Sequence, residues 1–326
     1  MPAGTPYALG RFRADNGEEF SGVVIGPDVV PLRSLLPASG DVGSLLADWT
    51  AARKLLGAAV DEAVAGRQVA PAARRADELT PLAPLIPGQI FQSGANYKTH
   101  VVDLMVAAAA EKAGSADPAE VRRQATALME ERAAHGTPYV FIGLASAVCG
   151  PQDDVVLPDI GVQHDWELEL GVVIGIEAYR VSRDDALGHV ACYTIVNDIT
   201  TRDRVFRPDM PGLGTDWLAG KNSPTFLPLG PWLVPAQFVP DPRDLRITLR
   251  LNGETMQDEL TADMIFGIPE LIEHVSAITP LRPGDLLLTG SPAGNGAHYG
   301  RYLHAGDVME SMITGLGTQR NRCVRP

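Results

Sequence analysis

The stretch Asp165-Trp166-Glu167-Leu168-Glu169-Leu170-Gly171-Val172-Val173-Ile174 carries the strongest signal for both fold and chemistry. Side chains on a β-strand alternate between two faces, so Asp165, Glu167 and Glu169 are predicted to share one face. The residues between them are apolar and predict that the opposite face packs against a core. Carboxylates about 6–7 Å apart along a strand repel each other unless a cation lies between them. Oxygen ligands suit Mg²⁺, Mn²⁺ or Ca²⁺, whereas a strand with a solvated acidic face is the alternative.

Composition and charge exclude several classes of protein. The chain has 326 residues, of which 45% are hydrophobic and 21% are charged, as expected for a globular protein with a substantial core. The net charge of −13 argues against nucleic-acid binding, which needs a basic surface. No apolar run approaches the roughly 18 residues of a membrane span, and no signal peptide is recognised. The three widely spaced cysteines predict reduced thiols, so we expect a cytoplasmic protein.

Two regions of the chain differ in pattern. Residues 1–85 are predicted to form a small α/β domain, with short strands followed by a helical stretch over about 42–65. The segment Leu82–Gly88 contains two prolines that block regular strand pairing, which places a boundary near residue 85. Residues 86–326 are predicted to form the second, larger domain.

The larger domain is predicted to be rich in short strands with a helical insertion. Apolar runs bounded by Gly, Pro, Asn and Asp predict strands at Tyr139–Ile142, Trp166–Ile176, Ala191–Val196, Pro231–Val234, Leu245–Leu251 and Leu286–Thr289. Asn252-Gly253 predicts a tight hairpin after the fifth of these. Two helices are expected in the insertion 104–137, the second capped by Asp117 and Pro118 and ended by Gly136. We therefore predict an α+β fold that is mostly β.

Polar residues outside the acidic stretch complete a candidate site. Asp198 follows an apolar strand and can add a third oxygen ligand to Glu167 and Glu169, and Lys221 can offset the remaining negative charge. A solvated surface lysine is the more ordinary interpretation of Lys221 taken alone.

Three further residues have weaker signals of their own. His100 and Asp103 are three apart on a predicted helix, where a carboxylate can raise the basicity of an imidazole. Ser291 lies in a Gly-rich turn after a predicted strand, and such a turn can present a hydroxyl and backbone N–H groups to an anion. An exposed histidine and a plain tight loop are the alternatives.

Eight motifs in a fixed order resemble those of the fumarylacetoacetate hydrolase family. They are GANYKTH, DWELELGVVIG, YTIVNDITTRD, GK, PTFLPLGPWLV, LNGETMQDELTADMIFGIPELI, PGDLLLTGSPAGNG and LGTQRNRCV, and they extend over residues 89–326. The resemblance implies a β-rich core of mixed rolled sheets, often with a small N-terminal domain, in a homodimer. It implies a small-molecule keto-acid substrate, Mg²⁺ or Mn²⁺ as cofactor, and no nucleic-acid or membrane partner. The insertion 104–137 stands where such proteins have a short lid.

The resemblance also implies roles for individual residues. Glu167, Glu169 and Asp198 match the metal ligands, and Lys221 matches an active-site lysine. His100 with Asp103 matches a pair that activates water. Substrate contacts are expected at Tyr97, Arg204 and Ser291, with Arg207 and Arg301 as further carboxylate partners.

The implied activity is hydrolysis of a C–C bond in a β-diketo acid such as an acylpyruvate. Two departures lie near the substrate rather than the metal. Gly143 stands where relatives often have lysine, and Val205 stands where they often have glutamine. Decarboxylation, isomerisation or hydration of a related keto acid is therefore an alternative, and the change at Gly143 mildly disfavours a decarboxylase. A non-catalytic, metal-stabilised ligand-binding protein is the alternative from another class.

Overall fold

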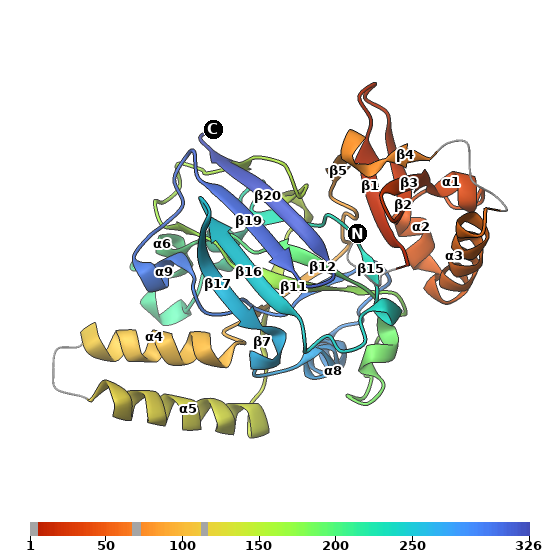
Figure 1. Cartoon of the computed structure of the whole chain (residues 1–326). Coiled ribbons are helices and arrows are strands. Elements are labelled where there is room, and N and C mark those ends of the chain that lie inside the picture. Colours follow the sequence, from red (N-terminus) through yellow and green to blue (C-terminus); the bar gives the residue numbers. More distant parts are fainter. Residues whose placement is uncertain (1–5, 67–72, 112–116) are drawn as a thin grey trace.

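The structure of the protein is a computed structural model that describes residues 6–66, 73–111 and 117–326. The described residues contain both helices and strands in substantial amounts. Figure 1 shows sheets at the centre, a group of N-terminal elements at one side and a pair of long helices at the other. The predicted α+β class with a β-rich core is confirmed.

The residues before Ala83 form their own antiparallel sheet, whose strands lie in the order β4-β3-β2-β1-β5. These strands are β1 Ala8–Arg13, β2 Glu19–Ile25, β3 Asp28–Pro31, β4 Arg74–Arg75 and β5 Thr80–Leu82. Three helices accompany them, α1 Leu32–Leu35, α2 Val42–Ala47 and α3 Trp49–Val64. The helical stretch predicted over 42–65 is divided at Asp48, because its side chain accepts a hydrogen bond from the Ala51 N–H and caps a new helix.

The central sheet has six strands in the order β15-β12-β11-β18-β6-β7. They are β6 Ile90–Gly94, β7 Tyr139–Gly143, β11 Leu168–Ile174, β12 Val190–Asn197, β15 Val234–Pro235 and β18 Leu286–Leu288. All pairings are antiparallel except that of β18 with β6. Every residue of β11 and β12 is buried, which explains why apolar residues dominate both faces of these strands.

A second sheet, in the order β17-β16-β19-β20-β9, contacts β11 and β12 of the central sheet. Its strands are β9 Val155–Val156, β16 Arg246–Leu251, β17 Glu254–Leu260, β19 Val308–Ile313 and β20 Gly317–Val324. Alternate residues such as Ile247, Leu249 and Met309 are buried, so one face of this sheet packs into the core. The hairpin predicted at Asn252-Gly253 joins β16 to β17, and both residues have positive φ.

The remaining elements are short, apart from three helices. Two small strand pairs are β8 Val148–Cys149 with β14 Leu227–Pro228, and β10 His164–Asp165 with β13 Thr200–Thr201. The other α-helices are α4 Lys98–Glu111, α5 Pro118–His135, α6 Arg202–Val205, α7 Trp217–Lys221, α8 Ile268–Ile278 and α9 Gly296–Tyr299. The 3-10 helices are Ala76–Glu78, Ala145–Ala147, Ala186–His189, Pro211–Leu213, Ala236–Phe238 and Thr261–Asp263.

Helices α4 and α5 form the predicted helical insertion and lie side by side (Figure 1). The signals at the ends of α5 are confirmed, since Asp117 caps the helix, Pro118 opens it and Gly136 follows its last turn. The part of the predicted first helix at Lys112 lies outside the described residues. Leu104 and Leu128, on α4 and α5 respectively, are both exposed.

Two predicted strands differ from the structure. The strand predicted over 166–176 is β11, which begins at Leu168 because Trp166 turns its indole into the core and donates to the Gly294 carbonyl at 2.9 Å. The strand predicted over 231–234 is the shorter β15, since Pro231 has no N–H to donate to a neighbouring strand.

Within the described ranges, no helix combines the length and apolar character that crossing a bilayer requires. All three cysteines are buried and free, as the sequence predicted.

The N-terminal elements contact the central sheet through backbone and side-chain contacts. Leu9 of β1 exchanges two backbone hydrogen bonds with Leu233, at 2.9 and 2.8 Å. The buried Trp49 of α3 lies against the backbone of Gly175, where an added Cβ would come within 2.7 Å of the indole. The end of β11 is therefore supported directly by the N-terminal helix.

We expect Trp49→Ala to lower the free energy of unfolding by about 3–5 kcal/mol, because it leaves a cavity between α3 and the central sheet. Leu55→Ala on the same helix is the matched control, since Leu55 is exposed and should change stability by less than about 0.5 kcal/mol. Urea denaturation followed by far-ultraviolet circular dichroism measures both. Equal effects of the two substitutions would contradict this packing role.

Candidate metal centre and active site

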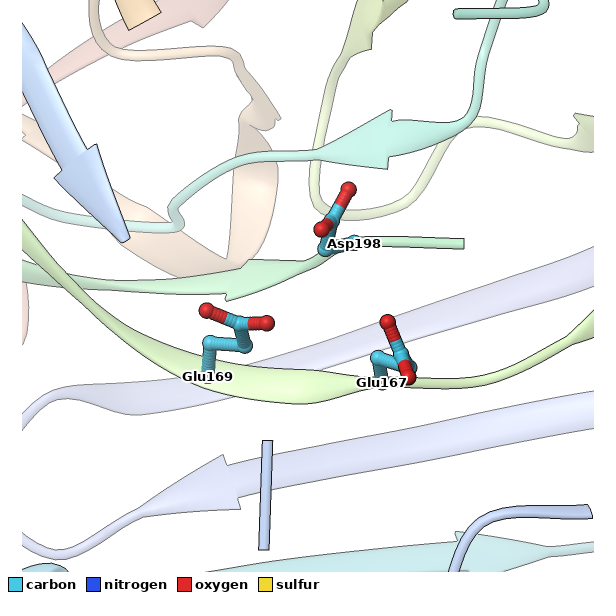
Figure 2. A group of neighbouring side chains, drawn as sticks. All are labelled: Glu167, Glu169 and Asp198. Atoms are coloured by element: carbon cyan, nitrogen blue, oxygen red, sulfur yellow. The ribbon is translucent and has the colours of Figure 1, made fainter. Parts of the chain in front are cut away.

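Three carboxylates meet because of the pairing between β11 and β12. Leu168 is opposite Asn197 in this antiparallel pair, so Glu167 and Asp198 face each other just beyond the last pair. Glu169 lies two residues along the same strand and therefore points to the same side. Each of the three side chains offers an oxygen atom, and these atoms all lie within 4.8 Å of one another. Figure 2 shows Glu167 and Glu169 on one chain segment and Asp198 on the neighbouring segment.

The acidic residues are buried rather than solvated. Glu167, Glu169 and Asp198 are 8%, 2% and 1% exposed, which excludes the alternative of a strand with a solvated acidic face. Asp165 does not join them, because it belongs to the separate strand β10. Its carboxylate instead accepts hydrogen bonds from the backbone N–H groups of Gly296 and Ala297 at 2.6 and 3.1 Å.

Two cationic side chains are bound to these carboxylates. Lys221, at the end of α7, is buried, and its Nζ donates to Glu167 and, at 2.6 Å, to Asp198 Oδ2. Arg202, at the start of α6, donates to Asp165 Oδ2 at 2.9 Å and to Glu167 Oε1 at 2.5 Å. The solvated-surface interpretation of Lys221 is therefore excluded, and its charge lies within the acidic cluster.

The pKa values reflect where the cations lie. Burial would raise the pKa of Glu167, but Arg202 and Lys221 outweigh it and hold that pKa below its ordinary value. Burial raises the pKa of Asp198 to about 6, against the attraction of Lys221. Burial and then repulsion by Asp198 raise the pKa of Glu169 well above its ordinary value. The negative charge of Glu169 is thus the one that neighbouring cations offset least among the three carboxylates.

The donor set fits a hard dication. Four buried carboxylates, including Asp165, face two cationic side chains, so full ionisation leaves two negative charges that one dication would neutralise. Among the described residues, Glu167, Glu169 and Asp198 form the cluster of acidic, histidine or cysteine side chains whose spacing suits a metal ion. All its donors are oxygens, which favours Mg²⁺, Mn²⁺ or Ca²⁺ over softer ions.

Neighbouring groups hold two of the ligands in place. Gln92 of β6 is buried and donates from Nε2 to Asp198 Oδ1 at 2.5 Å. The Gly290 N–H donates to Glu169 Oε2 at 2.6 Å. Gly290 has a φ of 92°, and an added Cβ would lie 2.9 Å from the Cβ of Asn96, so only glycine fits there. These bonds orient the carboxylates as outer partners of metal ligands do.

Ser291 lies next to the same cluster. Its Oγ accepts hydrogen bonds from the side-chain amides of Gln257 at 2.9 Å and Asn295 at 3.3 Å. The turn after β18 thus places the Gly290 N–H against Glu169 and the Ser291 hydroxyl at a cavity beside the cluster.

His100 is buried near the cluster, on the first turn of α4. Burial lowers the pKa of His100 to about 4, so the imidazole is neutral at pH 7 and able to accept a proton. Asp103 lies one turn further along α4, and its Oδ1 accepts from Arg122 Nη2 of α5 at 2.8 Å. The negative charge of Asp103 therefore favours the protonated form of His100, whereas its hydrogen bond is made to α5, the second helix of the insertion.

These groups line one cavity of about 350 Å³. Its polar lining consists of His100, Ser93, Ser291, Arg202, Lys221 and the three carboxylates, which we call the floor. Its apolar lining consists of Ala95, Leu104, Phe141, Val205, Phe206 and Trp217, which we call the wall. Floor and wall meet where Lys221 Nζ lies 6.0 Å from the centroid of the Phe141 ring.

The structure separates the other predicted substrate contacts from this cavity. Tyr97 is completely buried, and its side chain does not line the cavity. Arg204 is exposed and does not line the cavity, two residues along the short helix α6 from Arg202, which does. Arg207 pairs with Asp209, and Arg301 pairs with Asp307. None of these four residues lines the cavity, so substrate contacts at Tyr97, Arg204, Arg207 and Arg301 stay predictions.

Four residues of the site were missed in the sequence. Arg202 lies in the same motif as Arg204. Both belong to the one-turn helix α6, on which residues two apart face different directions, so recognition of that helix would have separated them. Gln92 lies two residues before the GANYKTH motif, and a polar side chain after the apolar pair Ile90-Phe91 was the available signal. Phe141 and Trp217 come from distant segments, and only the fold brings them together.

We expect Glu169→Gln to weaken Mn²⁺ binding about 100-fold or more, because loss of an outer partner of a metal ligand alone costs about 10–100-fold. Isothermal titration calorimetry with Mn²⁺ measures the affinity. Asp209→Asn is the control, since Asp209 is an exposed carboxylate paired with Arg207. Wild-type affinity in Glu169→Gln would rule out this carboxylate as a ligand.

We expect His100 to make stability depend on pH below 7. Its folded pKa of about 4 lies below the ordinary value of 6.5, so between these values the unfolded chain binds a proton that the folded protein does not. The free energy of unfolding should fall by up to about 3 kcal/mol more in the wild type than in His100→Gln as the pH is lowered from 7 to 4. Urea denaturation at several pH values tests this. His135→Gln, at the exposed end of α5, should follow the wild type, and parallel curves for His100→Gln and wild type would refute the expectation.

Comparison with known proteins identifies the larger region. Residues 89–324 match the sequence model of the fumarylacetoacetate hydrolase C-terminal family. The chain is 46% identical over 188 residues to a 2,4-didehydro-3-deoxy-L-rhamnonate hydrolase of Sphingomonas sp., covering 57% of this chain and 64% of that protein. It is 42% identical over 189 residues to a mitochondrial oxaloacetate tautomerase of Bos taurus, covering 57% and 59%. The matched stretches thus span less than two thirds of these relatives.

Solved structures resemble nearly the whole chain. A fumarylacetoacetate hydrolase from psychrophilic Exiguobacterium antarcticum gives a TM-score of 0.74 at 25% identity, covering 98% of this chain and 100% of that one. A maleylpyruvate hydrolase from Sphingobium sp. SYK-6, in complex with manganese(II) and pyruvate, gives 0.71 at 28% identity, covering 98% and 99%. The family match over most of the chain and the shared fold agree. The protein is a member of the fumarylacetoacetate hydrolase family.

Proposed function

We propose that the protein is a dication-dependent hydrolase that cleaves a C–C bond in a β-diketo acid. The observation that supports this most directly is the buried cluster of Glu167, Glu169 and Asp198, with its excess negative charge, at the floor of a cavity that also contains a neutral His100. Similarity to a maleylpyruvate hydrolase holding manganese and pyruvate supports the same class of substrate. The carboxylate end of the substrate would face the charged floor.

Each of these residues would have a separate role in the hydrolysis. A dication held by the three carboxylates would act as a Lewis acid toward the keto-acid oxygens. His100, being neutral, would accept a proton from the water that attacks the distal carbonyl carbon. The oxygen of that water then bonds to the carbonyl carbon, and the C–C bond breaks. Its electron pair passes to the keto-acid fragment, which takes up a proton, so the products are a carboxylic acid and an α-keto acid.

Lys221 and Ser291 would stabilise negative charge as it develops. Lys221 already binds Glu167 and Asp198, so its contribution is a fixed positive charge at the floor. The hydroxyl of Ser291 accepts two side-chain hydrogen bonds and donates one to the Pro292 carbonyl at 3.5 Å, so its orientation is set by the protein. Both groups are held before substrate binds, as electrostatic stabilisation of a transition state requires.

Enolisation, isomerisation or decarboxylation of a smaller keto acid is the second candidate. Its support is the 42% identity to an oxaloacetate tautomerase. Such a reaction uses the same cluster and a proton acceptor without requiring attack by water. A ligand-binding protein without catalysis is the third, and it is disfavoured because the acidic cluster, Lys221 and His100 all lie in one cavity.

We expect the purified protein with Mn²⁺ or Mg²⁺ to hydrolyse acetylpyruvate, and EDTA to abolish the activity. Loss of the ultraviolet absorbance of the diketone, with release of pyruvate and acetate, measures hydrolysis. Enolisation or decarboxylation of oxaloacetate without acetylpyruvate cleavage would favour the second candidate. Absence of turnover on both would favour the third.

His100→Ala should lower kcat about 100–10,000-fold while leaving Mn²⁺ affinity within a few fold, because a general base typically contributes that much. His135→Ala is the matched control, since His135 is exposed at the C-terminal end of α5 and does not line the cavity, and it should retain activity. Full activity of His100→Ala would remove His100 from the mechanism.

A further inference from the structure

The apolar wall of the cavity is a rigid aromatic surface. Phe141 of β7 and Trp217 of α7 stack with their ring centroids 4.3 Å apart and their planes at 11°. The Trp217 Nε1 donates to the Tyr139 hydroxyl at 2.6 Å, and that hydroxyl lies 3.1 Å from Thr215 Oγ1. The single donor of the indole is therefore satisfied away from the cavity. What the stacked pair offers a ligand is apolar ring surface.

Two more side chains extend this wall toward the solvent. Leu104 of α4 is 43% exposed and Phe206 is 68% exposed, although both line the cavity. Exposed apolar side chains at the opening of a buried charged site stabilise a bound ligand when it covers them. A ligand that reaches from the carboxylate cluster to the opening would cover both.

The cationic side chains of the cavity are already committed to protein carboxylates. Lys221 binds Glu167 and Asp198, and Arg202 binds Asp165 and Glu167. No other lysine or arginine lines the cavity among the described residues. A second carboxylate on a ligand would therefore lie against the apolar wall without a partner, and burial of an unpaired charge is strongly unfavourable.

We propose that the substrate carries an uncharged, planar apolar group, aryl or conjugated alkenyl, on its distal carbonyl carbon, and that Phe141, Trp217, Leu104 and Phe206 select it. This specificity rests on the proposed hydrolysis of β-diketo acids. It separates this chain from the oxaloacetate and maleylpyruvate enzymes that it resembles, whose substrates by name are dicarboxylic acids.

The first test compares three acylpyruvates in the Mn²⁺-loaded full chain. Isocaproylpyruvate and succinylpyruvate have distal groups of nearly the same shape, and only the second is charged. Benzoylpyruvate adds a planar ring. We expect kcat/KM to be about 10–100-fold higher for isocaproylpyruvate than for succinylpyruvate, and highest for benzoylpyruvate. Equal or greater kcat/KM for succinylpyruvate would overturn the proposal, and acetylpyruvate turnover would show that the proposed hydrolysis itself stands.

A second test changes the wall. Leu104→Arg places a cation at the opening, so the ratio of kcat/KM for succinylpyruvate to that for benzoylpyruvate should rise about 10-fold or more. Leu128→Arg adds the same charge to an exposed leucine on α5, whose side chain does not line the cavity, and should leave the ratio unchanged. An unchanged ratio in Leu104→Arg would refute the role of this wall.

A binding measurement separates this proposal from the catalytic one. Phenylpyruvate and α-ketoglutarate present the same keto-acid end, and neither is a β-diketone that can be hydrolysed. Calorimetry in the presence of Mn²⁺ should give a Kd at least about 10-fold lower for phenylpyruvate. If no diketo acid is turned over, this ratio still decides the chemistry of the cavity, and a lower Kd for α-ketoglutarate would overturn it.

Discussion

An imbalance of charge inside the protein governs the site. Asp165, Glu167, Glu169 and Asp198 are all buried, and among the described residues Lys221 and Arg202 are the cations that pair with members of this group. An unpaired buried carboxylate is costly, so without a further cation the cluster must retain protons, and the raised pKa values of Glu169 and Asp198 express that requirement. The fold thus holds together a group of charges that is complete only when a dication, or the protons that replace it, is present.

The scaffold tolerates this excess of negative charge because the strands and turns that carry the carboxylates are held by surrounding contacts. The paired strands β11 and β12 set the distances between the ligands, and both strands are buried along their whole length. The N-terminal unit supports the far end of β11 through Trp49, and the turn after β18 holds Glu169 through the Gly290 N–H. Repelling carboxylates would otherwise move apart, so rigid strands are what allow a preformed site.

Strand alternation and helix-capping residues predicted those features that depend on neighbouring residues in the sequence. Alternation along a strand placed Glu167 and Glu169 on one face, and capping residues placed both ends of α5. The same alternation failed for Asp165, because the Trp166 indole binds the distant Gly294 carbonyl and interrupts the strand. Arg202 was not singled out in the sequence, because its bonds to Asp165 and Glu167 depend on the one-turn helix α6, which was not recognised. Residues such as Gln92 and Trp217 act in the site through contacts between segments far apart in sequence, which no local pattern contains.

Glycine in place of lysine at position 143 affects both the charge of the site and the chemistry of its apolar wall. Gly143 stands where the family resemblance implies a lysine, and the amide of Gln92 fills the space beside it, since a Cβ there would lie 2.7 Å from Gln92 Oε1. Gln92 supplies a hydrogen bond to Asp198 but no charge. A lysine would have added a third cation near the cavity, both reducing the excess negative charge and offering a partner to a second substrate carboxylate. Its replacement by a neutral pair therefore leaves the full excess of negative charge for a dication. It also leaves the wall around Phe141, two residues away on the same strand, without a cation of its own.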